Sequence, residues 1–206
     1  MNIIMLGPPG AGKGTQGRLL SERIGAPRVS TGDMLRAAIA SGSALGRSVK
    51  ETLAKGNLVS DEIVVGLITE RLREADCAHG AVFDGFPRTI GQAEVLDDLL
   101  AGQQAKIDLV FNLQIDDDVL FRRIELRKSD GSARRDDTAE TLKNRLVVYH
   151  CNASPLLSYY QGQGKLEGVN SMAPITIVSD KIACAVCRAE WPTVSLIAEG
   201  RSGIIC

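Results

Sequence analysis

The stretch Gly7-Pro8-Pro9-Gly10-Ala11-Gly12-Lys13-Gly14-Thr15 decides the fold of this chain, and it directly follows the apolar run Ile3-Ile4-Met5-Leu6. A glycine-rich turn that leaves a buried strand points several backbone N–H groups into one concavity, which suits phosphate oxygens. Lys13 adds a mobile positive charge and Thr15 a hydroxyl. The spacing fits G-x-x-x-x-G-K, although Thr15 comes one place later than in the common form. An ordinary glycine-rich turn is the alternative, but the complete pattern favours a nucleoside triphosphate site.

The length allows one buried core with mobile insertions, or at most two small domains, and we expect a single domain over residues 1–206. The net charge of -1 gives no sign of a surface for nucleic acid or membrane. No apolar run approaches the roughly 20 residues that cross a bilayer. Because the N-terminus runs straight into the first strand, we expect no signal peptide and a cytoplasmic protein.

The cysteine pattern indicates free thiols in a reducing compartment rather than a metal site. Cys184-x-x-Cys187 is half of a zinc-ligand pattern, but no second Cys or His pair stands at a matching spacing. The chain has five cysteines: Cys77, Cys151, Cys184, Cys187 and Cys206.

Short apolar runs alternate with longer amphipathic stretches, which predicts an α/β domain with a five-stranded parallel sheet covered by helices on both faces. We expect helices over 14–24 and 117–128, and a third that begins with the capping-box pattern Asp137-x-x-Glu140. The run 184–206 is not expected to be helical, because Trp191-Pro192 interrupts it. The five expected strands are 3–6, 28–30, 81–84, 109–113 and 175–178.

Two segments fit the core pattern poorly and are candidates for mobile covers over the site. Residues 31–59 form a mostly helical excursion rich in glycine, and residues 127–137 are polar throughout with a turn-forming Asp130-Gly131. Solvated surface loops are the alternative, although the arginines of the second segment argue against it.

Asp84 and Arg88 follow the third expected strand, within Asp84-Gly85-Phe86-Pro87-Arg88. The carboxyl ends of parallel strands are where open α/β sheets bind ligands, so both side chains should reach the crevice of the phosphate loop. Asp84 is suited to hold Mg²⁺ through water, and capping of the loop is its alternative role.

Further arginines are expected near the same crevice. Arg123 and Arg127 stand four apart and share one helix face, Arg134 lies in the polar segment, and Arg145 lies on the next helix. Guanidinium groups match the charge that develops during phosphoryl transfer. Ordinary surface ion pairs remain the alternative, mainly for Lys128 and Arg135. Several arginines together indicate two polyphosphate ligands bound end to end.

With these motifs the chain closely resembles the adenylate kinase family of nucleoside monophosphate kinases. The resemblance covers roughly residues 1–183 and includes the shifted Thr15. Its departures are a short cover, since only residues 128–133 separate Arg127 from Arg134, and Asn170-Ser171 in place of the usual Asp-Gly. The similar motifs are the phosphate loop, Ser30-Thr31-Gly32-Asp33-Met34-Leu35-Arg36, Gly56-Asn57-Leu58-Val59-Ser60-Asp61, Phe83-Asp84-Gly85-Phe86-Pro87-Arg88-Thr89 with Gln92, Arg134-Arg135-Asp136-Asp137, Thr141-x-x-x-Arg145-Leu-x-x-Tyr149, Pro155-Leu156 and Tyr159-Tyr160.

The resemblance implies a P-loop fold with an AMP-binding mobile segment at 30–59 and a short LID segment at 126–137. It implies catalytic roles for Lys13, Asp84, Arg88, Arg123, Arg134 and Arg145, with Mg²⁺ held through nucleotide phosphates and water, Asp84 being nearby. The implied ATP-binding residues are Gly10, Ala11, Gly12, Lys13, Gly14, Thr15, Arg123, Arg127 and Ala173. The implied AMP-binding residues are Thr31, Arg36, Asn57, Leu58, Val59, Gly85, Phe86, Pro87, Arg88, Gln92, Arg134 and Arg145.

The expected activity is therefore reversible phosphoryl transfer from MgATP to AMP, giving two ADP, by a monomer in adenine nucleotide homeostasis. A UMP/CMP kinase on the same scaffold is the alternative, although Thr31 and Gln92 favour adenine. A nucleotide-dependent switch is a different class of function. It would need a guanine-reading Asn-Lys-x-Asp pattern, which the sequence lacks.

Overall fold

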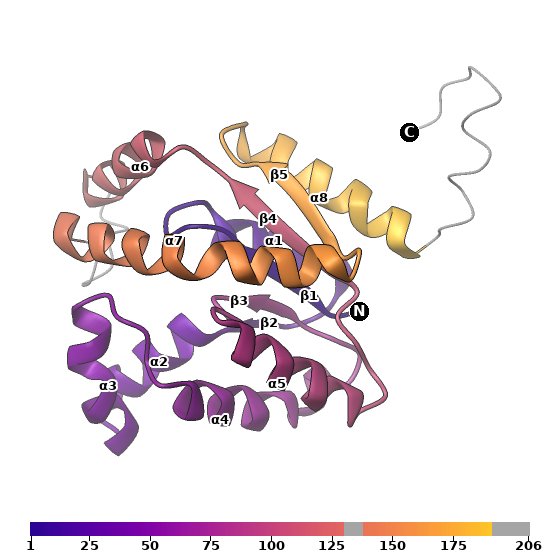
Figure 1. Ribbon diagram of the computed structural model, residues 1–206, viewed down its shortest axis with the longest axis horizontal. Coiled ribbons are helices and arrows are strands. Elements are labelled where there is room, and N and C mark those ends of the chain that lie inside the picture. Colours follow the sequence, from indigo (N-terminus) through magenta and orange to yellow (C-terminus); the bar gives the residue numbers. More distant parts are fainter. Residues whose placement is uncertain (130–137, 191–206) are drawn as a thin grey trace.

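The phosphate-loop stretch leaves the central strand of a parallel sheet in the computed structural model, which describes residues 1–129 and 138–190 (Figure 1). The strands are β1 (Ile3–Leu6), β2 (Arg28–Ser30), β3 (Val82–Asp84), β4 (Leu109–Gln114) and β5 (Leu166–Asn170). The helices are α1 (Lys13–Ile24), α2 (Thr31–Ala40), α3 (Ala44–Ala54), α4 (Asp61–Leu72), a 3₁₀ turn (Ala75–Cys77), α5 (Ile90–Ala101), α6 (Asp117–Ser129), α7 (Ala139–Gly162) and α8 (Ile175–Glu190).

The strand order is β2-β3-β1-β4-β5, and every pairing is parallel. The register of β1 with β3 sets Met5 beside Asp84, and that of β2 with β3 sets Ser30 beside Asp84. The segments that leave β1, β2 and β3 therefore emerge together at one edge of the sheet, which is where open α/β sheets bind ligands.

Alternation along β1 divides the core between the two faces of the sheet. Ile3 and Met5 pack with residues of α1 and α8, whereas Ile4 and Leu6 pack with residues of α2, α3, α4, α5 and α7. All four side chains are buried, as expected for a central parallel strand with helices on both faces. The expected three-layer fold is confirmed, and Figure 1 shows α8 and α5 on opposite sides of the strands.

One expected strand was wrong. Residues 175–178 open α8, and the fifth strand is β5, whose Leu166 to Asn170 pair with Val110 to Gln114 of β4. A run of four apolar residues does not distinguish a strand from a buried helix turn. The run continues at helical spacing through Ile182 and Val186, both buried against the sheet.

Two further expectations about helix ends were also wrong. The helix expected from Asp137 has Thr138 as its N-cap, and the Thr138 side chain accepts a hydrogen bond from the Thr141 N–H at 3.0 Å. The Thr138 hydroxyl at the N-cap accepts from the Thr141 N–H, so an aspartate at 137 is not needed to cap the helix. The segment from 184 was expected to lack helix, yet α8 continues to Glu190, and residues 191–206 lie outside the described residues.

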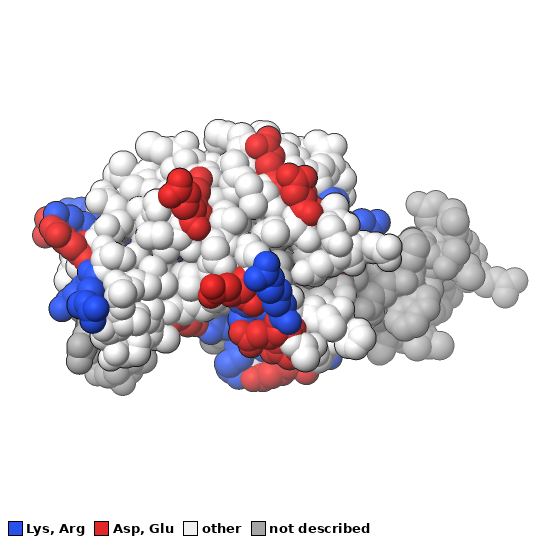
Figure 2. Space-filling model, turned by 90° about the horizontal axis from the view of Figure 1, so that it is seen from below, with Lys and Arg blue, Asp and Glu red and all other residues white. Residues whose placement is uncertain are grey.

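On the face seen in Figure 2, charged side chains lie in small separate groups, some acidic alone and some mixed, on a largely uncharged surface. This distribution agrees with a net charge of -1. Within the part of the chain that the structure describes, no helix is both long and apolar enough to cross a bilayer. The cysteines at 77, 151, 184 and 187 are free thiols, and Cys77 alone among these four is buried.

Candidate active site

The phosphate loop joins β1 to α1 and closes on itself. The Lys13 ammonium group donates hydrogen bonds to the Gly7 and Pro8 carbonyls at 2.6 and 2.7 Å. Gly12 is the N-cap of α1 with φ of 95°, a left-handed conformation that favours glycine. No side chain caps this helix. Its first N–H groups, which have no partner within the helix, therefore face the concavity of the loop and can bind an anion.

A cleft of about 480 Å³ opens beside the loop, where β1, β2 and β3 end. Thr31 joins two of its walls, because its hydroxyl donates to the Gly85 carbonyl at 2.9 Å. Most of the expected residues come together here, from segments far apart in the sequence. Those lining the cleft are Gly10, Gly12, Lys13, Gly14, Thr15, Thr31, Arg36, Asn57, Leu58, Val59, Asp84, Gly85, Pro87, Arg88, Gln92 and Arg145.

Positive charge is concentrated in this cleft. Arg88 holds its guanidinium through Nε–H, which donates to the Gly85 carbonyl at 2.8 Å. Desolvation by the surrounding protein and the nearby charges of Arg145 and Arg36 lower the pKa of Arg88, and Asp84 opposes the shift. Arginines this close to one another remain protonated and repel one another, and a bound anion would offset that repulsion.

Gln92 is buried at the start of α5 and is fixed at both ends of its amide. Its Oε1 accepts from the Arg88 N–H at 2.7 Å, and its Nε2 donates to Asp61 Oδ1 at 2.6 Å. Thr89, the N-cap of α5, also donates to Asp61. The amide therefore lines the cleft in one orientation, which a residue that distinguishes nucleobases requires.

A second pocket of about 260 Å³ lies on the other side of the loop and shares Gly10, Gly12 and Thr15 with the cleft. Arg123 and Ala173 line it together with Ala11. The Arg123 guanidinium donates to the Ser171 carbonyl at 2.6 Å, and the Ser171 hydroxyl donates to the Ala11 carbonyl. These bonds attach the turn after β5 to the phosphate loop, so the loop separates two adjoining pockets.

Comparison with known proteins agrees with this geometry. A family-wide sequence model described as adenylate kinase matches residues 5–165. This chain belongs to the adenylate kinase family. It is 50% identical to an adenylate kinase of Caulobacter vibrioides (strain NA1000 / CB15N) over 186 residues, which cover 90% of this chain and 97% of that protein.

Two further relatives have the same name. The adenylate kinase of Phenylobacterium zucineum is 53% identical over 90% of this chain and 95% of its own length. That of Parvibaculum lavamentivorans is 47% identical over 88% of this chain and 90% of its own. The expected family is thus confirmed, and these comparisons give no support to the UMP/CMP alternative.

Three of the residues expected to bind nucleotides do not line either pocket as the structure describes them. Phe86 is fully buried in the core and lines neither pocket. Arg134 lies outside the described residues, as does the side chain of Arg127, so their expected roles stay predictions.

The sequence reasoning missed several residues that shape the site. Arg28 and Asp33 line the large cleft, Asp61 orients Gln92, and Ser171 holds the phosphate loop. In the sequence, Asn170-Ser171 stands out only as a departure from the usual Asp-Gly of the family. Arg28 begins β2, at the end of the strand away from the site, and no local sequence pattern shows that its long side chain reaches Asp84 at the carboxyl end of β3.

Proposed function

We propose that this chain catalyses reversible transfer of a phosphoryl group from MgATP to AMP, giving two molecules of ADP. The observation that carries the proposal is the pair of pockets that meet at one phosphate loop, with arginines on both sides. The names of its relatives, which are about half identical over nearly the whole chain, support the same reaction. Both pockets are formed within one chain, which supports a monomer as the active unit.

The larger cleft is the proposed acceptor site. Thr31, Arg36, Arg88 and Gln92 line it, so a monophosphate would meet two guanidinium groups while its base lies against a fixed amide. The smaller pocket is the proposed site for the adenine of ATP, between Arg123 and Ala173. We propose residues 30–59 as the mobile acceptor segment and 126–137 as the short cover, with closure that excludes water.

The proposed chemistry is an in-line displacement. An oxygen of the AMP phosphate attacks the terminal phosphorus of ATP, and the bond from that phosphorus to the bridging oxygen breaks, leaving ADP. Since the attacking oxygen is already ionised, no general base is needed. The protein's contribution is to position the two nucleotides and neutralise charge, through Lys13, the N–H groups of the loop and the arginines.

Mg²⁺ is expected to accompany ATP, and the residues present fit that ion. Thr15 and Asp84 line the same cleft, and Asp84 Oδ2 lies about 3.5 Å from the position that a Cβ on Gly14 would take. Among the described residues no cluster of three or more metal-ligating side chains exists. We expect the cation to be held mainly by phosphate oxygens and water. When bound, Mg²⁺ supplies neutralisation of phosphate charge, with Asp84 and Thr15 as the residues beside it.

An acceptor screen tests the proposed function. ADP is measured after ATP is mixed with AMP, UMP, CMP or no acceptor, and we expect rapid formation of ADP with AMP alone. Equal consumption of ATP with and without AMP would reject the transfer reaction, and faster turnover with UMP or CMP would reassign the acceptor.

Replacement of Arg88 by glutamine, in the same assay, should lower turnover on the order of 10²–10³, the usual loss when one donor to a developing oxyanion is removed. ATP binding, measured separately, should be largely retained. The matched control is Arg188→Gln, since Arg188 is exposed on α8, outside the two proposed mobile segments, and lines neither pocket. Turnover that survives the change at Arg88 would contradict its proposed role.

A further inference from the structure

Four side chains of alternating charge that line the large cleft are joined in series by hydrogen bonds, and Arg28 connects the two carboxylates. Arg28 is the first residue of β2, and its Nη1–H donates to Asp84 Oδ2 at 2.7 Å. Its Nη2–H donates to Asp33 Oδ2 in the first turn of α2. One guanidinium group therefore joins carboxylates from two different elements, β3 and α2.

Asp33 links Arg28 to Arg36, which lines the proposed acceptor site. Its second oxygen, Oδ1, accepts a hydrogen bond from Arg36 one turn further along α2. Because Arg28 occupies Oδ2 and Arg36 occupies Oδ1, the plane of the Asp33 carboxylate is fixed from both sides. The order of groups is Asp84, Arg28, Asp33, Arg36, and their charges sum to zero.

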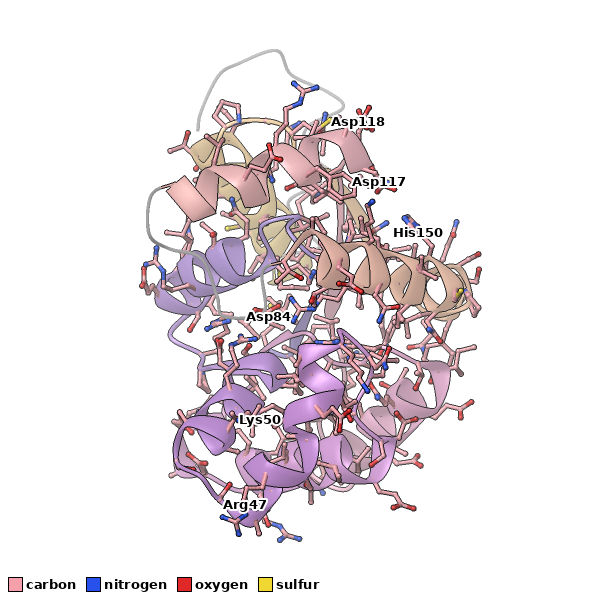
Figure 3. The ribbon with its side chains drawn as sticks, turned by 90° about the vertical axis from the view of Figure 1, so that its left-hand side faces the viewer. Arg47, Lys50, Asp84, Asp117, Asp118 and His150 are labelled. Atoms are coloured by element: carbon pink, nitrogen blue, oxygen red, sulfur yellow. The ribbon has the colours of Figure 1, made fainter. Side chains whose placement is uncertain are left out.

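The Arg28 side chain has little freedom to point elsewhere. Only 26% of it is exposed, and its Cδ lies 3.3 Å from the position that a Cβ on Gly17 would take, so the stem lies against α1. Its Nη1 lies 3.8 Å from the corresponding position on Gly14 in the phosphate loop. Figure 3 labels Asp84 between the upper and lower halves of the molecule, where these elements meet.

We propose that Arg28 is a positioning residue: its guanidinium fork fixes Asp33, and through Asp33 it aims Arg36 at the phosphate of the acceptor. The inference rests on the proposed function and deepens it, since it concerns how the AMP site is formed. The planar fork matters because its two N–H groups reach two carboxylates in fixed directions, which a lysine ammonium group does not do.

Electrostatics supports the same assignment. Burial alone would raise the pKa of Asp33, but the hydrogen bonds from Arg36 and Arg28 outweigh it and lower that pKa to about 2. Without Arg28 the pair Asp33 and Asp84 would present excess negative charge beside the phosphates. Asp33 would then hold Arg36 as its sole cation, and both changes oppose the binding of a second anion.

The test measures AMP affinity by titration calorimetry of the intact protein, without ATP or metal. Arg28→Gln should weaken AMP binding about tenfold, the scale of one charge-assisted hydrogen bond. Arg28→Lys keeps the charge but loses the fork, so it should recover only part of the lost AMP affinity. Thermal unfolding of each variant checks that it is folded, and Arg188→Gln is the matched control, because Arg188 is exposed on α8 and lines neither pocket.

A double-mutant cycle separates positioning from a general loss of charge. If Arg28 acts through Asp33, adding Arg28→Gln to Asp33→Asn should change AMP affinity less than about twofold. Unchanged affinity in Arg28→Gln, full recovery in Arg28→Lys, or fully additive losses in the double variant would each overturn the inference. Wild-type protein that makes no ADP from ATP and AMP would instead reject the proposed function, so the two failures are distinguishable.

Discussion

At the scale of single residues, the site is organised by carboxylates that hold arginine and amide side chains in place. Asp33 holds Arg36, Asp61 holds Gln92, and Asp84 lies against Arg28. Each of these contacts restricts a group that faces the cleft. Groups held before the ligand arrives lose less conformational entropy on binding, so pairing of this kind is a form of preorganisation.

The pKa of Asp33 leads to a prediction about stability and pH. Its folded pKa of about 2 lies below the ordinary value of 3.8, so ionised Asp33 stabilises the fold above pH 4. That stabilisation is lost as the pH falls towards 2, with Arg28 and Arg36 as the facing charges and Asp84 beyond Arg28.

Urea unfolding of wild type and Asp33→Asn at several pH values measures this effect. The difference in free energy of unfolding should be constant from pH 7 to 5 and should shrink between pH 4 and 3. A difference that stays level down to pH 3 would show that the carboxylate is not stabilised by its arginines.

At the scale of elements, α7 closes the end of the acceptor segment. The Thr141 hydroxyl donates to the Ala54 carbonyl at 3.1 Å, and Asn144 Nδ2 donates to the Lys55 carbonyl at 2.6 Å. The last carbonyls of a helix such as α3 lack partners within the helix, and these side chains provide them. Gly56, with φ of 77°, permits the approach, because a Cβ there would lie 2.9 Å from the Thr141 carbonyl oxygen.

This contact predicts that α7 restrains the acceptor segment. Asn144→Ala should speed amide hydrogen exchange in residues 45–58, because the end of α3 loses a cap and opens more often. Mass spectrometry of the exchanged peptides checks this, with exposed Lys143→Ala on the same helix as control. Equal exchange in both variants would mean that the Asn144 bonds do not restrain the segment.

At the scale of the whole molecule, the strand order explains why one loop serves two pockets. β1 lies between β3 and β4, so the phosphate loop at its end has the β3 segment on one side and the β4–β5 half on the other. Asp84 and Arg88 reach the loop from the first side, and Arg123 and Ser171 reach it from the second. Two ligands can therefore meet end to end over a single helix N-terminus.

Local sequence was sufficient for much of this arrangement. Four of the five strands and the phosphate loop follow from patterns a few residues long, because turn glycines and buried strands carry short-range signals. Most other residues of the cleft were expected only from the resemblance to the family. The strand expected at 175–178 failed for the opposite reason. Whether a short apolar run becomes a strand or a helix depends on which segment pairs with the edge of β4, and that edge is occupied by Leu166–Asn170.

The sequence by itself predicted the chemistry of this protein, through a glycine-rich loop suited to phosphate, arginines suited to phosphoryl charge, and a family signature around Asp84 and Gln92. Only the tertiary structure decided how those charges are partnered. Arg28 and Asp84 are 56 residues apart and meet because β2 pairs with β3 in one register. Charge pairing across a sheet depends on register, and register is set by the packing of the whole core rather than by any local pattern.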